Sequence, residues 1–92
     1  MQVIYRLEAL ADLHNHFTYI ANEDPAAAAR VAAAIRRSIT RLELFPYSAR
    51  KGIVPGTYEL VIPRLPYIAV YRVHSFVEIL AVYHSSTDEP HA

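Results

Sequence analysis

Three side chains in the second half of the chain could carry acid–base chemistry: Glu59, Arg72 and His84. The carboxylate could accept a hydroxyl proton, the guanidinium could stabilise charge on a phosphate, and the imidazole, with a usual pKa of about 6.5, could protonate a leaving oxygen. Such a set would suit metal-independent cleavage of RNA. A structural interpretation is favoured, in which His84 forms a hydrogen bond at a strand end and Arg72 forms a cross-strand ion pair with Glu59 or Glu78.

A metal site is not predicted. His14 and His16 are close in sequence, but residues two apart on a helix point about 200° apart and cannot hold one ion together. The chain contains no cysteine, which excludes disulfides and thiolate zinc sites. We therefore expect neither a metal nor a cofactor.

Composition indicates a small folded protein that needs a partner. The chain has 92 residues, of which 53% are hydrophobic, so we expect one domain over residues 1–92, with a polar tail at 85–92 and an exposed apolar patch. Nine basic residues balance nine acidic ones, so no global positive field attracts nucleic acid. The start lacks a leader pattern and no apolar run spans a bilayer, so a cytoplasmic protein without a membrane partner is predicted.

Two helices are predicted in the first half. The first begins near Glu8, and the second begins where Asp24 can cap free amides ahead of Pro25. The second helix is expected to end near Leu44. Apolar stripes at spacings of three and four are formed by Leu10, Leu13, Phe17, Ile20 and Ala21, and by Ala28, Val31, Ile35, Ile39 and Leu42. The many alanines of the second helix allow close approach, which predicts an antiparallel hairpin.

Four strands complete the predicted fold. The segments 2–6, 58–62, 67–73 and 76–84 are rich in β-branched and aromatic residues, and a loop is expected around residues 48–56. The order β-α-α-β-β-β predicts an α+β protein in which the helical hairpin packs on an antiparallel sheet.

Several segments together resemble the RelE/ParE toxin superfamily: ALADLHNHFTYIANEDPAAAARVAAAIRRSITRLELFP, GIVPGTYELVIP, PYIAVYRV and EILAVYHSSTDEP. The resemblance covers nearly the whole chain and favours the ParE-like branch. It implies the same fold, a cognate antitoxin as partner, and a target that is either DNA gyrase or the translating ribosome. The favoured function is a gyrase inhibitor that acts by protein contact and reaches DNA only through its antitoxin.

Two alternatives remain open. One is a RelE-like ribosome-dependent mRNA endoribonuclease using Glu59, Arg72 and His84, which is disfavoured by Ile68, where RNA-cleaving relatives tend to carry arginine, and by the neutral charge. The other is a non-toxic co-repressor that only binds antitoxin, because Tyr58 stands where ParE-like sequences commonly carry arginine. An enzyme is thus the less favoured class.

Two sets of contact residues are predicted. The target would meet the sheet rim and the polar tail, through Tyr58, Arg72, Tyr83 and His84. The antitoxin would meet Leu13, Phe17 and Ile20, although burial in the core is the competing interpretation. The arginines of the second helix, Arg30, Arg37 and Arg41, are interpreted as a solvated face, with a target or DNA contact as the alternative.

Overall fold

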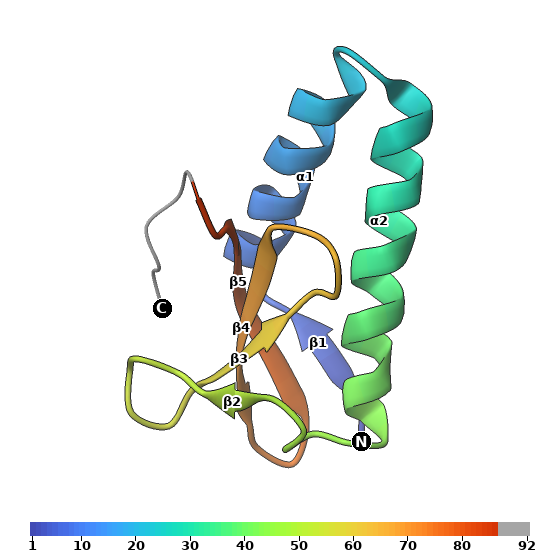
Figure 1. Ribbon diagram of the computed structural model, residues 1–92. Coiled ribbons are helices and arrows are strands. Elements are labelled where there is room, and N and C mark those ends of the chain that lie inside the picture. Colours follow the sequence, from blue (N-terminus) through green and yellow to red (C-terminus); the bar gives the residue numbers. More distant parts are fainter. Residues whose placement is uncertain (87–92) are drawn as a thin grey trace.

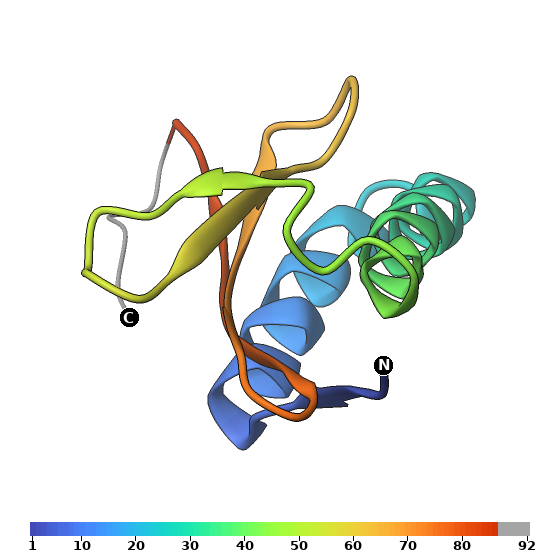
Figure 2. The same ribbon diagram turned by 90° about the horizontal axis from the view of Figure 1, so that it is seen from below.

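The computed structural model describes residues 1–86 as two layers, with a helical hairpin on one face of a five-stranded sheet (Figure 1). The elements are β1 (Val3–Tyr5), α1 (Leu7–Ala21), α2 (Pro25–Thr40), the 3-10 turn η1 (Arg41–Glu43), β2 (Arg50–Lys51), β3 (Tyr58–Val61), β4 (Tyr67–Val73) and β5 (Val77–His84). Seen from below, both helices lie on the same side of the sheet (Figure 2). The predicted α+β class and the helical hairpin are confirmed.

The sheet differs from the prediction in one respect, because it is mixed rather than wholly antiparallel. Its order is β1-β5-β4-β3-β2, and β1 runs parallel to β5 with Val3 opposite Val77. A parallel pair needs a long crossover connection, which the helical hairpin and the following strands provide here. Strand β2 lies in the segment expected to be a loop and pairs with β3. Because β2 consists of only two charged residues at the sheet edge, it has no alternation of apolar and polar residues from which a strand could be predicted.

The start of α2 forms as predicted and its end forms earlier. Asp24 accepts a hydrogen bond from the Ala27 backbone N–H at 3.0 Å, and Pro25 occupies the first turn. The helix ends at Thr40 and tightens into η1 rather than continuing to Leu44. Such 3-10 turns are common at helix ends.

The core lies between the hairpin and the sheet. Its fully buried large side chains are Ile35, Ile39, Leu42, Ile62, Tyr71, Val77, Ile79 and Val82. On α1, however, Ala9 is buried and Leu10 is 47% exposed. The stripe predicted for α1 is therefore wrong at Leu10. The reason is that α1 packs on β5 as well as on α2, which turns its buried line toward Ala9.

Beyond the end of β1, side chains of α1 cover the exposed edge of β5. β1 pairs only with residues 77–79 of β5. Farther along, the Val82 backbone N–H donates to the Asp12 carboxylate at 2.9 Å, and His16 Nε2 donates to the Val82 carbonyl at 2.8 Å. Two side chains one helical turn apart thus bind the backbone N–H and C=O of one residue, on the edge of β5 that β1 no longer covers. Over the described range 1–86, neither helix is long and apolar enough to cross a membrane.

Candidate functional site

The three candidate catalytic residues do not converge. Glu59 and Arg72 lie on the sheet face away from the helices, whereas His84 lies beside Tyr67 on the helix-bearing face. A β-bulge at Leu80 shifts the alternation along β5 and turns His84 to that face. In the sheet register Arg72 lies opposite Glu78, and His84 is six residues farther along β5, roughly 20 Å at 3.3 Å per residue. One phosphate could not contact both side chains.

Glu59 is held in an ion pair that the sequence did not reveal. Its side chain is buried, and Arg50 donates to Glu59 Oε1 from Nε at 3.2 Å and from Nη2 at 2.9 Å. Arg50 comes from β2, directly opposite Glu59. A carboxylate engaged in this way is a poor candidate for a general base, because the side chain is buried and Arg50 already occupies one of its two oxygens.

The predicted cross-strand ion pair of Arg72 with Glu59 or Glu78 is wrong. Glu78 instead pairs with His74 at 2.9 Å and with Arg6 at 3.6 Å. Arg72 Nη1 donates to the Pro55 carbonyl at 3.4 Å, in the loop between β2 and β3. Arg72 therefore lies at the end of the sheet that carries the loop between β2 and β3, which we term the loop end.

Tyr58 lies at the same end, within a row of tyrosines. Its ring stacks on Tyr71 at 5.4 Å between centroids and meets the edge of Tyr47 at 5.6 Å. Tyr71 is fully buried and donates to the Pro46 carbonyl at 2.8 Å. Burial raises the pKa of Tyr71 to about 12. Tyr58 itself is half-buried, so part of its ring can reach a partner.

Tyr83 and His84 occupy the opposite end of the sheet. Only 4% of Tyr83 is exposed, and burial, together with the negative charge of Glu59, raises its pKa. His84 is half-buried and meets the Tyr67 ring at 5.3 Å. The four predicted target contacts thus lie at two separate ends of the sheet, and at each end the two side chains point to opposite faces. The predicted polar tail lies outside the described residues from 87 onward.

The histidines of α1 face different elements. His14 lines a groove beside α2, whereas His16 binds β5. Across residues 1–86, no group of three or more histidine, cysteine, aspartate or glutamate side chains is placed to hold a metal ion.

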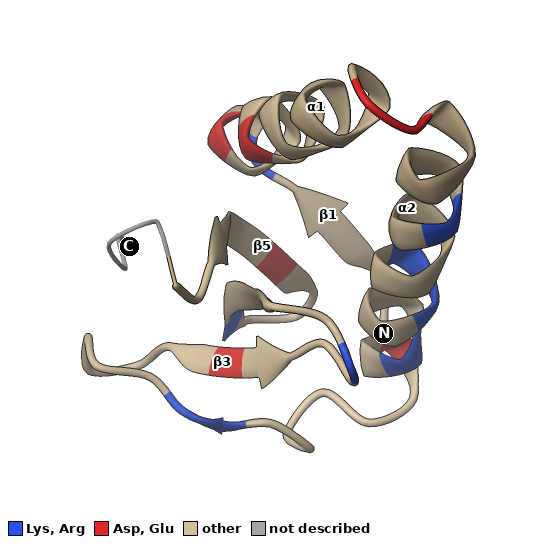
Figure 3. Cartoon of the chain, turned by 45° about the horizontal axis from the view of Figure 1, so that its top comes forward, with Lys and Arg blue, Asp and Glu red and all other residues tan. Residues whose placement is uncertain are grey.

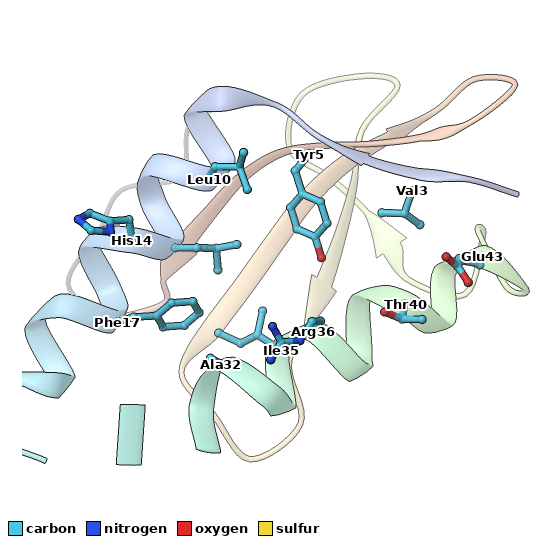
Figure 4. A pocket seen from close by; sticks show the side chains of 11 residues that line it. Val3, Tyr5, Leu10, His14, Phe17, Ala32, Ile35, Arg36, Thr40 and Glu43 are labelled. Carbon is cyan, nitrogen blue, oxygen red and sulfur yellow. The ribbon is translucent and has the colours of Figure 1, made fainter. Parts of the chain in front are cut away.

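A groove of about 580 Å³ lies near the predicted antitoxin contacts. It is bounded by β1, α1 and α2, and we term it the hairpin groove (Figure 4). It is lined by Val3, Tyr5, Leu10, Leu13, His14, Phe17, Ala32, Ile35, Arg36, Thr40 and Glu43. Leu13 and Phe17 belong to this lining as well as packing on the core, whereas Ile20 packs on the core outside it. Two of the three predicted antitoxin contacts therefore reach the groove.

The groove combines an apolar floor, a charged border and a neighbouring sheet edge. Among the described residues, Arg36 and Glu43 are its only Arg, Lys, Asp or Glu lining side chains. Burial raises the pKa of Tyr5 despite the opposing charge of Arg36. β1 is an edge strand, and its Ile4 is 41% exposed. Tyr5 and Arg36 were not predicted as site residues, although the spacing of Arg36 four residues from both Ala32 and Thr40 could have placed it on this face.

Comparison with known proteins defines the class. A solved structure of the chromosomal ParDE toxin–antitoxin system from P. aeruginosa matches 91% of this chain and 95% of its own, with a TM-score of 0.83 and 24% identity. At that identity the match establishes the fold. The family model of the ParE toxin of the type II toxin–antitoxin system parDE matches residues 3–89. A relative from Sinorhizobium fredii, named as a candidate toxin, Y4kP, is 40% identical over 97% of this chain and 93% of its own. The chain belongs to the ParE toxin family.

Proposed function

We propose that this protein is the toxin of a toxin–antitoxin pair, that it poisons DNA gyrase in the cytoplasm by protein contact, and that a cognate antitoxin neutralises it. The observation that carries the proposal is the match of the ParE toxin family to residues 3–89, which include every helix and strand described above. The separation of Arg72, on β4, from His84, at the end of β5, adds support, because a ribonuclease would need its cation and its acid around one phosphate.

The loop end of the sheet is the better surface for the target. Tyr58 is partly exposed there, Arg72 lies at the same end on the other face of the sheet, and Tyr47 and Ile53 in the adjoining loops are 64% and 76% exposed. An aromatic residue and an arginine among exposed apolar side chains are typical of strong protein contacts. At the other end of the sheet, Tyr83 offers almost no accessible surface.

The hairpin groove is the proposed antitoxin site. An amphipathic helix could place apolar side chains against Leu10, Leu13 and Phe17, and an extended segment could pair with the open edge of β1. Helix-in-groove binding and strand addition are both common ways of recognising a peptide. Covering the groove would remove exposed apolar surface that a small protein otherwise leaves in water.

A gyrase cleavage assay tests the target. Purified toxin is incubated with gyrase, ATP and circular plasmid, and DNA is analysed after the protein is denatured. Linear DNA is expected to accumulate, and pre-mixed antitoxin is expected to suppress it. Tyr58→Ala combined with Arg72→Ala should reduce the linear product, whereas His84→Ala at the opposite end should not.

A translation assay provides the contrasting outcome. Normal supercoiling and no linear DNA, together with mRNA cleavage on ribosomes that His84→Ala abolishes, would replace the gyrase proposal with the ribonuclease alternative. If neither assay responds while the chain still binds antitoxin, the co-repressor alternative would stand.

A further inference from the structure

A second groove lies on the other flank of α2. It has a volume of about 650 Å³ and runs between α2 and the turn that joins β3 to β4. Four exposed arginines line it, and we term it the arginine groove: Arg30, Arg37, Arg41 and Arg64. Within residues 1–86, none of its lining residues is aspartate or glutamate and none of the four arginines forms an ion pair. Positive charge is therefore concentrated here in a chain with a formal net charge of zero.

The four cations come from two parts of the chain. Arg30, Arg37 and Arg41 are seven and four residues apart, a spacing that places them on one helical face. Arg64 comes from the turn, where Leu65 N–H donates to the Ile62 carbonyl at 3.3 Å. Figure 3 shows the basic part of this turn beside the basic flank of α2. The convergence distinguishes this site from an ordinary solvated helix face.

Arg64 also has an unusual backbone conformation. Its φ of 65° makes it the only residue other than glycine with a positive φ in the described range 1–86. Asparagine or glycine would adopt this conformation more readily than arginine. Strained residues of this kind occur preferentially at functional sites.

We propose that the arginine groove binds the phosphate backbone of duplex DNA without reading its sequence. Guanidinium groups match phosphate geometry with paired hydrogen bonds. The described lining of the groove has no aromatic side chain to stack on a base, and the rest of it is mainly small or aliphatic, so contact is to the backbone. An acidic protein partner fits less well, because protein interfaces combine arginine with the aromatic anchors tryptophan and tyrosine, and the described lining has neither aromatic residue.

The choice of DNA among polyanions rests on the proposed function, because a poison of gyrase acts where gyrase holds DNA. It departs from the sequence-based expectation that the toxin reaches DNA only through its antitoxin. Direct contact with DNA beside the enzyme would position the toxin on gyrase that is already engaged with its substrate.

Salt-dependent binding tests the proposal with the full chain alone. Binding to a fluorescent duplex is measured by anisotropy as salt rises from about 50 to about 200 mM. Four phosphate contacts predict a slope of log affinity against log salt of about −3.6, so that affinity falls roughly 100-fold. A slope near zero, or binding to polyglutamate but not to the duplex, would overturn the proposal, and the second result would assign the groove to an acidic protein.

Neighbouring residues on α2 provide a matched control. Arg37→Gln combined with Arg41→Gln removes two charges from the arginine groove and should change the slope by about 1.8. Arg36→Gln changes a residue that lines the hairpin groove and should leave the slope unaltered. Arg64→Asn keeps a residue type that tolerates positive φ and should change the slope by about 0.9. A change of the slope by Arg36→Gln as large as that by Arg64→Asn would contradict a specific groove.

The two proposals can fail separately. Thermal melting confirms that each variant is folded, and DNA binding is measured without gyrase. The toxin could show a slope near −3.6 that becomes shallower in the arginine variants as described, and yet not poison gyrase. This result would reject the proposed target and uphold the DNA site. Unchanged DNA binding by the Arg37→Gln/Arg41→Gln variant would reject the DNA site, whatever the gyrase assay shows.

Discussion

The hairpin groove and the arginine groove lie on opposite flanks of α2 and differ in chemistry. The first has an apolar floor and a single arginine, Arg36, whereas the second gathers four arginines and, among the described residues, no acid. Arg36 and Arg37 are adjacent in sequence, yet a helix turns by about 100° per residue, so the two side chains enter different grooves. A net charge of zero therefore conceals one surface suited to an apolar segment and another suited to phosphate.

The two grooves nevertheless share one support. Ile35 and Ile39 project from α2 into the core between them and are almost fully buried. Damage to this packing should affect both surfaces, whereas a change at the border of one groove should leave the other intact. This distinction makes the comparison testable.

The largest effect is expected from Ile39→Ala. The side chain is completely buried, and truncating a buried isoleucine to alanine typically costs about 2–5 kcal/mol. Urea denaturation should show this loss, and both antitoxin affinity and DNA binding should fall as the fraction of folded protein falls. Arg30→Ala, on the exposed flank, should change stability by no more than about 0.5 kcal/mol. Loss of binding at only one groove would show that Ile39 does not support both.

Leu10→Glu should separate the grooves. Leu10 lines the hairpin groove and is 47% exposed, so the variant should fold but bury a carboxylate against the antitoxin. We expect antitoxin affinity to fall by about 100-fold, because burying an unpaired charge is costly. The control is Leu7→Glu, the same change on the same helix at a position that is 81% exposed and outside the groove lining. Antitoxin affinity is measured by calorimetric titration, and equal affinities of the two variants would argue against the hairpin groove as the antitoxin site. DNA binding should stay normal in both variants.

Alkaline titration of Tyr71 should weaken the sheet beneath both grooves together. Its pKa is about 12 in the folded chain, against an ordinary value of 10.0, so the folded state holds the proton more tightly. The stabilisation is complete below pH 10 and is lost as pH rises through 12. Tyr71→Phe should cost about 0.5–1.5 kcal/mol at neutral pH by removing the bond to Pro46. Thermal melts of this variant should also show a smaller loss of stability at alkaline pH. A pH profile of stability unaltered by the substitution would exclude Tyr71 as the titrating group.

Sequence periodicity predicted the elements because local signals define them. The Asp24-Pro25 start and the spacing of Ile35 and Ile39 are written within a few neighbouring residues, and the structure confirms them. The parallel pairing of β1 with β5 depends on how distant segments meet. The bulge at Leu80 likewise reverses the face of His84 without a local sequence signal.

The sites were less predictable for the same reason. Leu13 and Phe17 carry a helical pattern that marks them as apolar, and both line the hairpin groove. The partner of Glu59 is Arg50, from a strand too short to recognise. Arg64 joins the arginines of α2 only through the geometry of a turn, which composition and spacing do not encode.

The smallest effect, and the finest test of the comparison, is expected from Asp24→Ala. The change removes the carboxylate that accepts from Ala27 N–H and should cost about 1 kcal/mol by fraying the first turn of α2. Ala27 and Arg30, in the first two turns, line the arginine groove, whereas the hairpin groove uses α2 only from Ala32 onward. The slope of log DNA affinity against log salt should therefore become shallower, but by less than the change of about 0.9 expected for one lost phosphate contact. Antitoxin affinity should be unchanged. Asp24→Asn, which retains a capping oxygen, should restore the slope. If antitoxin affinity fell as much as DNA binding, the two flanks of α2 would not be independent surfaces.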